Sequence, residues 1–311
     1  MFAGIRRLIQ ALQATLDRDA RYREGRFNAL RIAQEDLRLM LGRLLTGQQR
    51  GRAGSLAEME FKVYSQWGDD GIIKYLINQL PGIPKTFVEF GVEDYREANT
   101  RFLLVNDNWR GLVMDSSEAN VAQIKSEGIY WRHDLTALAA LVTTENVNGL
   151  IAGAGFTGEA GLLHIDIDGN DYWVWEALTA IDPAIAIVEY NSVFGAERAI
   201  AVPYQADFDR TRAHHSNLYF GASLGALRLL AGRKGYVFIG CNSAGNNAYF
   251  VRRDHAAPLK DLALSAQYVA SAFRESRDEQ GNLTYLSGVQ RIEAIEGLPV
   301  FNVGTGQTED L

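Results

Sequence analysis

Residues 162–189 read LLHIDIDGNDYWVWEALTAIDPAIAIVE, and their pattern of apolar and polar side chains indicates the fold class. Residues 162–167 alternate apolar and polar side chains, which is typical of a strand. Residues 172–180 show helical spacing, and the Asp-Pro pair at 182–183 ends that helix before a second apolar run begins. A strand, a helix and a strand in this order predict a parallel sheet, because parallel neighbours need a crossover connection.

The same alternation extends outward over most of the chain. Before this stretch we predict the strands 86–92, 111–115 and 129–131 and the helices 72–80, 98–106, 116–126 and 135–147. After it we predict a helix at 223–232 and two strands at 236–240 and 248–251, joined by a Gly/Asn-rich hairpin turn. The sequence therefore predicts an α/β fold: a doubly wound, mostly parallel sheet with a C-terminal antiparallel hairpin.

The N-terminal segment is expected to be a helical arm with its own charge. Two amphipathic helices are predicted at 3–20 and 27–46, followed by a linker at 46–55. Residues 1–55 hold eleven Arg and five acidic residues, or +6; since the whole chain carries −7, the remainder carries −13. Such an arm is suited to packing within the molecule, to a homo-oligomer seam, or to a peripheral membrane contact through residues 1–46.

Composition limits the remaining classes. The 311 residues are 47% hydrophobic, and the predicted units are the arm 1–55, an α/β domain at 56–260 and a C-terminal helical cover at 261–311. The negative net charge argues against nucleic acid as the main partner. Cys241 is the only cysteine, so an intramolecular disulfide and a Cys-rich metal site are excluded. We expect a cytoplasmic protein, because no apolar run reaches about 18 residues and no secretory signal is apparent.

Carboxylates end nearly every predicted strand. In chain order these strand-end residues are Glu89, Asp115, Asp134, Asp166 with Asp168, and Glu189. The carboxyl ends of parallel strands meet at one edge of a sheet, where open α/β folds bind their ligands. Gly91 lets a ligand approach the backbone closely, and Asp115 is well placed to accept hydrogen bonds from a ribose diol. We therefore place the chemistry at this edge.

This order of motifs, with a hairpin last, resembles the class I S-adenosylmethionine-dependent methyltransferases, and within them most nearly the FkbM-like group. The resemblance covers roughly residues 60–255, and its motifs are Val88-Glu89-Phe90-Gly91, Asp115 and Asp166-Ile167-Asp168-Gly169. It implies a Rossmann-like methyltransferase fold with S-adenosylmethionine as the cofactor. The implied activity is O-methylation of a sugar, a glycan or another small polar acceptor.

The resemblance also assigns roles to the strand-end residues. It implies that Glu89 and Gly91 contact the amino-acid part of the cofactor, that Asp115 holds the ribose, and that Asp134 holds the adenine amino group. Helix capping is the plain structural alternative for both aspartates. Glu93 stands where the family carries a second glycine, and this acidic loop suits a cationic sulfonium and repels a pyrophosphate.

The acceptor side of the site is assigned from residue chemistry. The candidate catalytic residues are Asp166, Asp168 and His215, and the candidate substrate-binding residues are Asn170, Glu189, Asn191, His214 and Asn242. The irregular stretch 190–216, which holds both histidines, is typical of a lid or substrate loop. Asp166 and Asp168 are also possible ligands of a divalent metal, although a metal is not favoured.

Two other functions stay open on the sequence. Asp166-x-Asp168 also fits the nucleophile loop of a Mg²⁺-dependent phosphotransferase or phosphatase of the haloacid dehalogenase type. Against this reading, several strands precede the loop, and Asn170 replaces the usual threonine. The third hypothesis is a non-catalytic scaffold with a methyltransferase-like fold, which the replacement at Glu93 favours.

Overall fold

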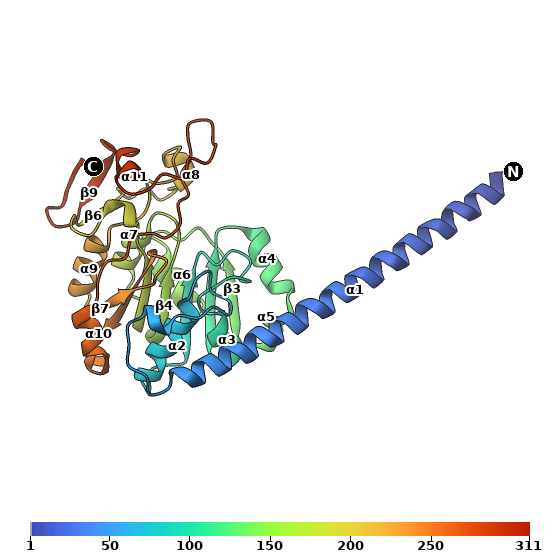
Figure 1. Cartoon of the computed structure of the whole chain (residues 1–311), viewed down its shortest axis with the longest axis horizontal. Coiled ribbons are helices and arrows are strands. Elements are labelled where there is room, and N and C mark those ends of the chain that lie inside the picture. Colours follow the sequence, from blue (N-terminus) through green and yellow to red (C-terminus); the bar gives the residue numbers. More distant parts are fainter. Residues whose placement is uncertain (1) are drawn as a thin grey trace.

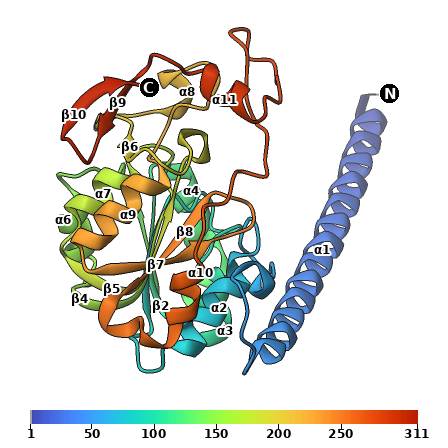
Figure 2. The ribbon, with the colours of Figure 1, turned by 60° about the vertical axis from the view of Figure 1, so that its left-hand side comes forward.

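A seven-stranded sheet forms the centre of the molecule in the computed structural model, which describes residues 2–311 and the side chains of residues 13 and 15–311 (Figures 1 and 2). The strand order is β3-β2-β1-β4-β5-β8-β7. The strands are β1 (Thr86–Phe90), β2 (Arg110–Asp115), β3 (Leu135–Ala139), β4 (Gly158–Ile165), β5 (Ile181–Glu189), β7 (Tyr236–Cys241) and β8 (Asn247–Arg252). β1 to β5 are parallel, and β8 pairs antiparallel with both β5 and β7.

Helices cover both faces of this sheet, so the predicted doubly wound, mostly parallel fold is confirmed. On one face the apolar core joins the sheet to α6 (Val147–Gly153), α7 (Asp171–Ala177) and α9 (Leu224–Arg233). On the other face it joins the sheet to α2 (Asp69–Gln79), α3 (Arg101–Asp107), α4 (Glu118–Ser126) and α10 (Lys260–Ser265). Successive residues of a strand face opposite sides, and Phe87 and Val88 accordingly belong to different cores.

The predicted hairpin is present, but its antiparallel strand is not the edge strand. β8 lies between β5 and β7, with Glu189 opposite Asn247, and β7 forms the edge of the sheet. Since β8 is buried on both sides, the polar residues at its start reach the interior at the carboxyl end of β5.

The prediction for residues 129–147 is wrong. Residues 129–131 belong to the short helix α5 (Gly128–Arg132), and the strand is β3, where a helix was expected. In β3 the alternating Leu135 and Ala137 are buried beside β2, so pairing with β2 overrides the helical propensity of Leu and Ala. Asp134 therefore precedes its strand instead of ending it.

The arm is one helix instead of two. α1 runs from Phe2 to Gln49, because Gly25 alone does not break a helix and no proline interrupts it. The predicted linker is therefore helical in its first four residues, and Gln49 is anchored by hydrogen bonds to Met59 O (2.5 Å) and Gly71 O (3.1 Å). Of the first predicted helix, the side chains of residues 3–12 lie outside the part of the chain whose side chains the structure describes.

The C-terminal segment is only partly helical, which corrects the predicted helical cover. Apart from α10 and α11 (Val289–Glu293) it holds an irregular strap at 266–288 and the hairpin β9 (Pro299–Asn302) and β10 (Gln307–Asp310). β9 pairs with β6 (Ile200–Ala201), so a three-stranded sheet covers the irregular stretch that follows β5. Within residues 2–311, no helix combines the length and the apolar character that spanning a bilayer requires.

Candidate functional site

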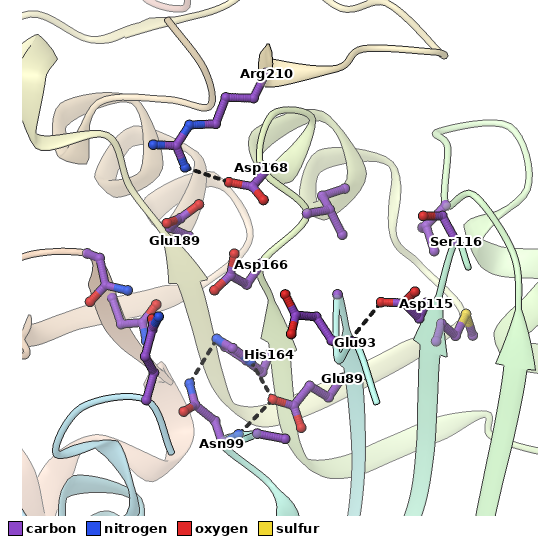
Figure 3. A pocket seen from close by; sticks show the side chains of 18 of the residues that line it. Glu89, Glu93, Asn99, Asp115, Ser116, His164, Asp166, Asp168, Glu189 and Arg210 are labelled. Carbon is purple, nitrogen blue, oxygen red and sulfur yellow. Dashed lines mark hydrogen bonds and ion pairs between the residues drawn. The ribbon is translucent and has the colours of Figure 1, made fainter. Parts of the chain in front are cut away.

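A cavity of about 560 Å³ opens at the carboxyl ends of β1, β2, β4 and β5 (Figure 3). Eight of the side chains that line it are carboxylic acids: Glu89, Glu93, Glu97, Asp115, Asp166, Asp168, Glu189 and Glu275. Arg210 is the one Arg or Lys among the residues lining this cavity. Because like charges in a shared cavity repel, the site is built to receive a group that carries positive charge or hydrogen-bond donors.

At the end of β1, Glu89 is committed to internal contacts. It is 2% exposed and accepts hydrogen bonds from the backbone N–H groups of Asn99 (2.9 Å) and Thr100 (3.1 Å). His164 Nδ1, from β4, lies 2.9 Å from the same carboxylate. Burial acts to raise the pKa of Glu89, but the hydrogen bond and charge of His164 and the loop donors outweigh it, so this pKa is lowered. Glu89 therefore holds the loop before α3 against β4.

A close backbone contact, which the sequence does not show, requires glycine at position 91. Its φ is +73°, and a Cβ at this position would lie 1.6 Å from the carbonyl oxygen of Asp166. Its N–H donates to Met114 O on β2 (2.9 Å). The loops after β1 and β4 therefore touch through bare backbone, and only glycine allows that approach.

Asp115 ties the loop after β1 to the end of β2. Its Oδ2 accepts from the backbone N–H of Glu93 (2.8 Å), and its Oδ1 accepts from the N–H of Ser117 (2.9 Å). Glu93 has a φ of +48°, a left-handed conformation that favours glycine. The position thus keeps the backbone of the expected second glycine while presenting an acid, and the contact with Asp115 holds it there.

The turn after β4 concentrates three aspartates with different environments. Asp171 accepts from the N–H groups of Ile167 and Gly169, both at 2.9 Å, and closes the turn; burial raises its pKa to about 6. Asp168, at a φ of +55°, is exposed and pairs with Arg210 Nη1 (2.8 Å). Asp166 points into the cavity (Figure 3).

Asp166 and Glu189 titrate together at the centre of the cavity. Burial raises the pKa of Asp166 to about 7, against the lowering effect of the charge of His164. Glu189, at the end of β5, is 7% exposed; its burial and then the charge of Asp166 raise its pKa well above the usual value. The two acids therefore keep a proton to a higher pH than they would in water, and the pKa of Asp166 lies close to neutral pH.

The irregular stretch after β5, which the sequence predicts to be a lid or substrate loop, contributes Phe208 and Arg210 to the wall of the cavity. Phe208 packs on Gly169, where a Cβ would lie 2.1 Å from its ring. Arg210 begins α8 (Arg210–Ala213), donates to Asn217 O (2.8 Å) and lies over the ring of Phe220 at 4.0 Å. These contacts hold the guanidinium above Asp168.

Five predicted site residues do not line the cavity. Asp134 lies at the opposite end of the sheet, with a side chain that is 71% exposed and 3.7 Å from Arg110, because it precedes β3. His214 bonds to Ser216 Oγ (2.8 Å), and His215 lines a separate hollow beside Arg277.

The other two predicted residues outside the cavity, Asn191 and Asn242, are buried amides that form hydrogen bonds with backbone groups. Asn191 donates to Leu218 O and Phe220 O. Asn242 accepts from the hairpin N–H groups and donates to Asp69 and Asn246. Asn170 does line the cavity, and its Nδ2 donates to Gln205 O (2.8 Å).

Several lining residues were not found from the sequence. They are Gln66, Trp67, Asn99, His164, Phe273 and Glu275. His164 carries a signal, a basic side chain within an apolar strand. Trp67 and Phe273 carry none: their rings stack with centroids 6.0 Å apart, although 206 positions separate them in the chain.

Asp166 and Asp168 are the possible metal ligands predicted from the sequence. Within residues 2–311, no group of three or more His, Cys, Asp or Glu is arranged to hold a metal ion. Asp168 forms an ion pair with Arg210, so a fixed positive charge already lies next to Asp166 and Asp168.

The sheet order with its antiparallel β8 is that of the Rossmann-like methyltransferase fold. No family model matches this sequence, and no curated protein matches it. Similar solved structures include the N-terminal domain of EvdMO1 with SAH bound (10% identity, 68% of this chain and 94% of that one, TM-score 0.38). A second is a geranyl diphosphate C-methyltransferase from Streptomyces coelicolor A3(2) (10% identity, 65% of this chain and 71% of that one, TM-score 0.37). A third is an S-adenosylmethionine-dependent methyltransferase from Clostridium acetobutylicum ATCC 824 (8% identity, 59% of this chain and 90% of that one, TM-score 0.37). These structures are distant from this chain, so we infer its function from the geometry of the cavity.

Proposed function

We propose that this protein is an S-adenosylmethionine-dependent methyltransferase that acts on a small polar acceptor. The observation that carries the proposal is the concentration of eight carboxylic acids around one cavity at the carboxyl ends of the parallel strands. A sulfonium nucleoside is cationic and has no phosphate, so it suits this cavity, whereas a dinucleotide or nucleotide phosphate is repelled.

The lining residues divide into groups that suit the parts of this cofactor. Asp115 and Ser116, at the end of β2, are the candidates for the ribose hydroxyls. Leu141 and Val142, which follow β3, offer an apolar wall for the adenine ring, and no acid stands there, because Asp134 lies at the other end of the strand. The acidic loop at Glu93 is the candidate for the amino-acid part.

Asp166 is the proposed general base. When bound, the cofactor would supply a methyl group from its sulfonium. The acceptor hydroxyl must lose a proton as its oxygen is methylated, and the carboxylate of Asp166 takes that proton. A base with a pKa of about 7 is suited to this task at neutral pH. Glu189 lines the same cavity, and its raised pKa limits the negative charge beside Asp166.

The acceptor end supports O-methylation of a sugar, a glycan or a comparable polar molecule. Asn246 and Asn247 from the hairpin, and Asn170 from the turn after β4, place amide groups on the wall around the two acids. Amides and carboxyl groups recognise hydroxyl groups through hydrogen bonds. Trp67, stacked on Phe273, adds an apolar surface at the same cavity.

The same charges oppose the phosphotransferase hypothesis, because eight acids disfavour a phosphate substrate. The scaffold hypothesis makes a separate expectation, which is cofactor binding without transfer. Incubation with methyl-labelled S-adenosylmethionine and a panel of glycosides distinguishes a methyltransferase from a scaffold. Labelled product supports the methyltransferase, and tight cofactor binding without any product favours the scaffold.

Isothermal titration with S-adenosylhomocysteine tests cofactor binding itself. We expect binding by the native protein and a loss of roughly tenfold or more in Asp115→Ala, because this removes both an acid of the cavity and the contact that shapes the loop at Glu93. Asp134→Ala is the matched control, since its side chain lies at the far end of the sheet, and it should bind as the native protein does. Absence of binding, or equal losses in the two variants, would contradict the proposal.

A further inference from the structure

The helix α1 carries an apolar seam that is exposed along its whole described length. Its positions recur at alternating intervals of four and three residues: Leu16, Ala20, Arg23, Phe27, Leu30, Gln34, Leu37, Leu41 and Leu44. All nine are exposed, and Phe27, Leu30 and Leu37 are 71%, 66% and 65% exposed. Spacing of this kind over about four heptads is the pattern of a coiled coil.

The body of the protein lies against a different side of α1. Leu39, Gly42, Thr46 and Gln49 are the positions that face it, and a Cβ on Gly42 would lie 2.6 Å from Val63. The seam therefore points away from the body. The N-terminal half of the helix also extends beyond the body, as Figure 1 shows. A second helix along the seam leaves the contacts of Leu39, Gly42 and Gln49 with the body in place.

The chemistry beside the seam favours a protein helix over a lipid surface. Asp17, Asp19 and Glu24 flank the apolar positions together with Arg26 and Arg31. Helices that lie on membranes have broad apolar faces bordered by basic residues, and acids next to the apolar stripe oppose contact with anionic lipid. A narrow stripe bordered by both signs of charge suits a partner helix of the same composition.

We propose that two copies of this chain pair through their α1 seams as an antiparallel coiled coil. With Phe27 of one copy opposite Leu30 of the other, the register places Leu41 opposite Leu16 and Ala20 opposite Leu37. The two polar positions, Gln34 and Arg23, then share a layer. Every other layer from residue 16 to residue 41 is apolar, and the twofold axis repeats each layer.

The charges beside the seam select this orientation. A parallel pair places Asp19 near Glu24 of the second helix and Arg26 near Arg31, so that both contacts are repulsive. The antiparallel register places Asp17 near Arg38 and Glu24 near Arg31, so that both contacts are attractive, and the axis doubles them. Arg31 is available for this contact because Glu127, 3.5 Å away, is held more closely by Arg96 at 2.9 Å. Charge pairing next to the seam sets orientation and partner choice.

Sedimentation of the full-length protein over a range of concentrations tests the pairing. We expect a dimer in the native protein and a dissociation constant higher by at least about a hundredfold in Leu37→Arg. Ile32→Arg is the matched control, because Ile32 is also exposed on α1 but lies off the seam; it should remain dimeric. A monomer at every concentration, or equal effects of the two variants, would overturn the proposal. So would a native monomer that sediments with phosphatidylserine-containing vesicles.

Cross-linking tests the orientation. Cys241 is buried, so Leu16→Cys and Leu41→Cys each introduce a single accessible thiol. The antiparallel register predicts cross-linked dimers only when the two variants are mixed, since residue 16 lies opposite residue 41. Cross-linking of each variant with itself would show a parallel pair and contradict the register. Circular dichroism of both variants verifies that the helix is retained.

Discussion

At the residue scale, burial turns ordinary aspartates into groups with different tasks. Asp171 accepts hydrogen bonds from the turn that it closes, and Asp168 forms an ion pair with Arg210. Asp166 faces the cavity, and its pKa is raised to about 7. The sequence places these acids together because all three follow the same strand, β4, within one turn. The sequence does not reveal which acid has which contacts, because these depend on backbone N–H donors and on Arg210 from a distant irregular segment.

The raised pKa of Asp166 predicts that Asp166→Asn stabilises the protein above pH 7. The folded-state pKa exceeds the unfolded one, so its contribution to stability is complete below about pH 4 and is lost as the pH rises through about 7. Removing the charge should raise the free energy of unfolding by ~1–2 kcal/mol at pH 8, less than the full shift implies because the side chain is partly exposed.

Urea unfolding at pH 4 and pH 8 measures this effect. The difference between native protein and Asp166→Asn should be small at pH 4 and appear at pH 8. Asp168→Asn, which removes an exposed acid in the same turn, should stay within about 0.5 kcal/mol of the native protein. Equal unfolding free energies of native protein and Asp166→Asn at both pH values would show that Asp166 is not held in a raised-pKa environment.

At the element scale, the loops after β1 and β4 act as one unit because they meet at Gly91. The sequence identifies both strands and the turn between β4 and α7, since their periodicities are local. It misplaces β3, because Leu and Ala alternate there in a pattern that also suits a helix, and the choice depends on β2 next to it. The error moves Asp134 to the wrong end of the sheet.

Gly91→Ala should destabilise the protein by roughly 2–4 kcal/mol. The added Cβ meets the Asp166 carbonyl oxygen, which belongs to the backbone of a second loop, and alanine is strained at a φ of +73°. Thermal unfolding measures the change. Gly149→Ala is the control, because a Cβ there meets nothing within 4 Å inside α6, and it should be neutral or slightly stabilising. A stable Gly91→Ala variant would mean that the two loops are not in backbone contact.

At the scale of the whole molecule, the chain separates into an acidic body that holds the cavity and a helix that reaches away from it. The charge difference between residues 1–55 and the rest indicates this division from sequence alone. The continuity of α1 is not predicted, although a single glycine at position 25 does not stop a helix. The three-stranded C-terminal sheet is not predicted either, because its hairpin depends on pairing with β6 from a distant part of the chain. The seam on α1 is visible in the sequence, but only the structure shows which side of the helix stays free.

A crystal structure of the protein soaked with S-adenosylhomocysteine shows whether the acidic cavity binds the nucleoside. We expect the nucleoside between Asp115 and the wall at Leu141 and Val142, with its sulfur directed toward Asp166 and the acceptor space bounded by Glu189 and Asn247. The Asp115→Ala crystal, soaked in the same way, should lack the ligand. Density for the nucleoside outside this cavity, or an empty cavity in the native crystal at saturating ligand, would contradict the account.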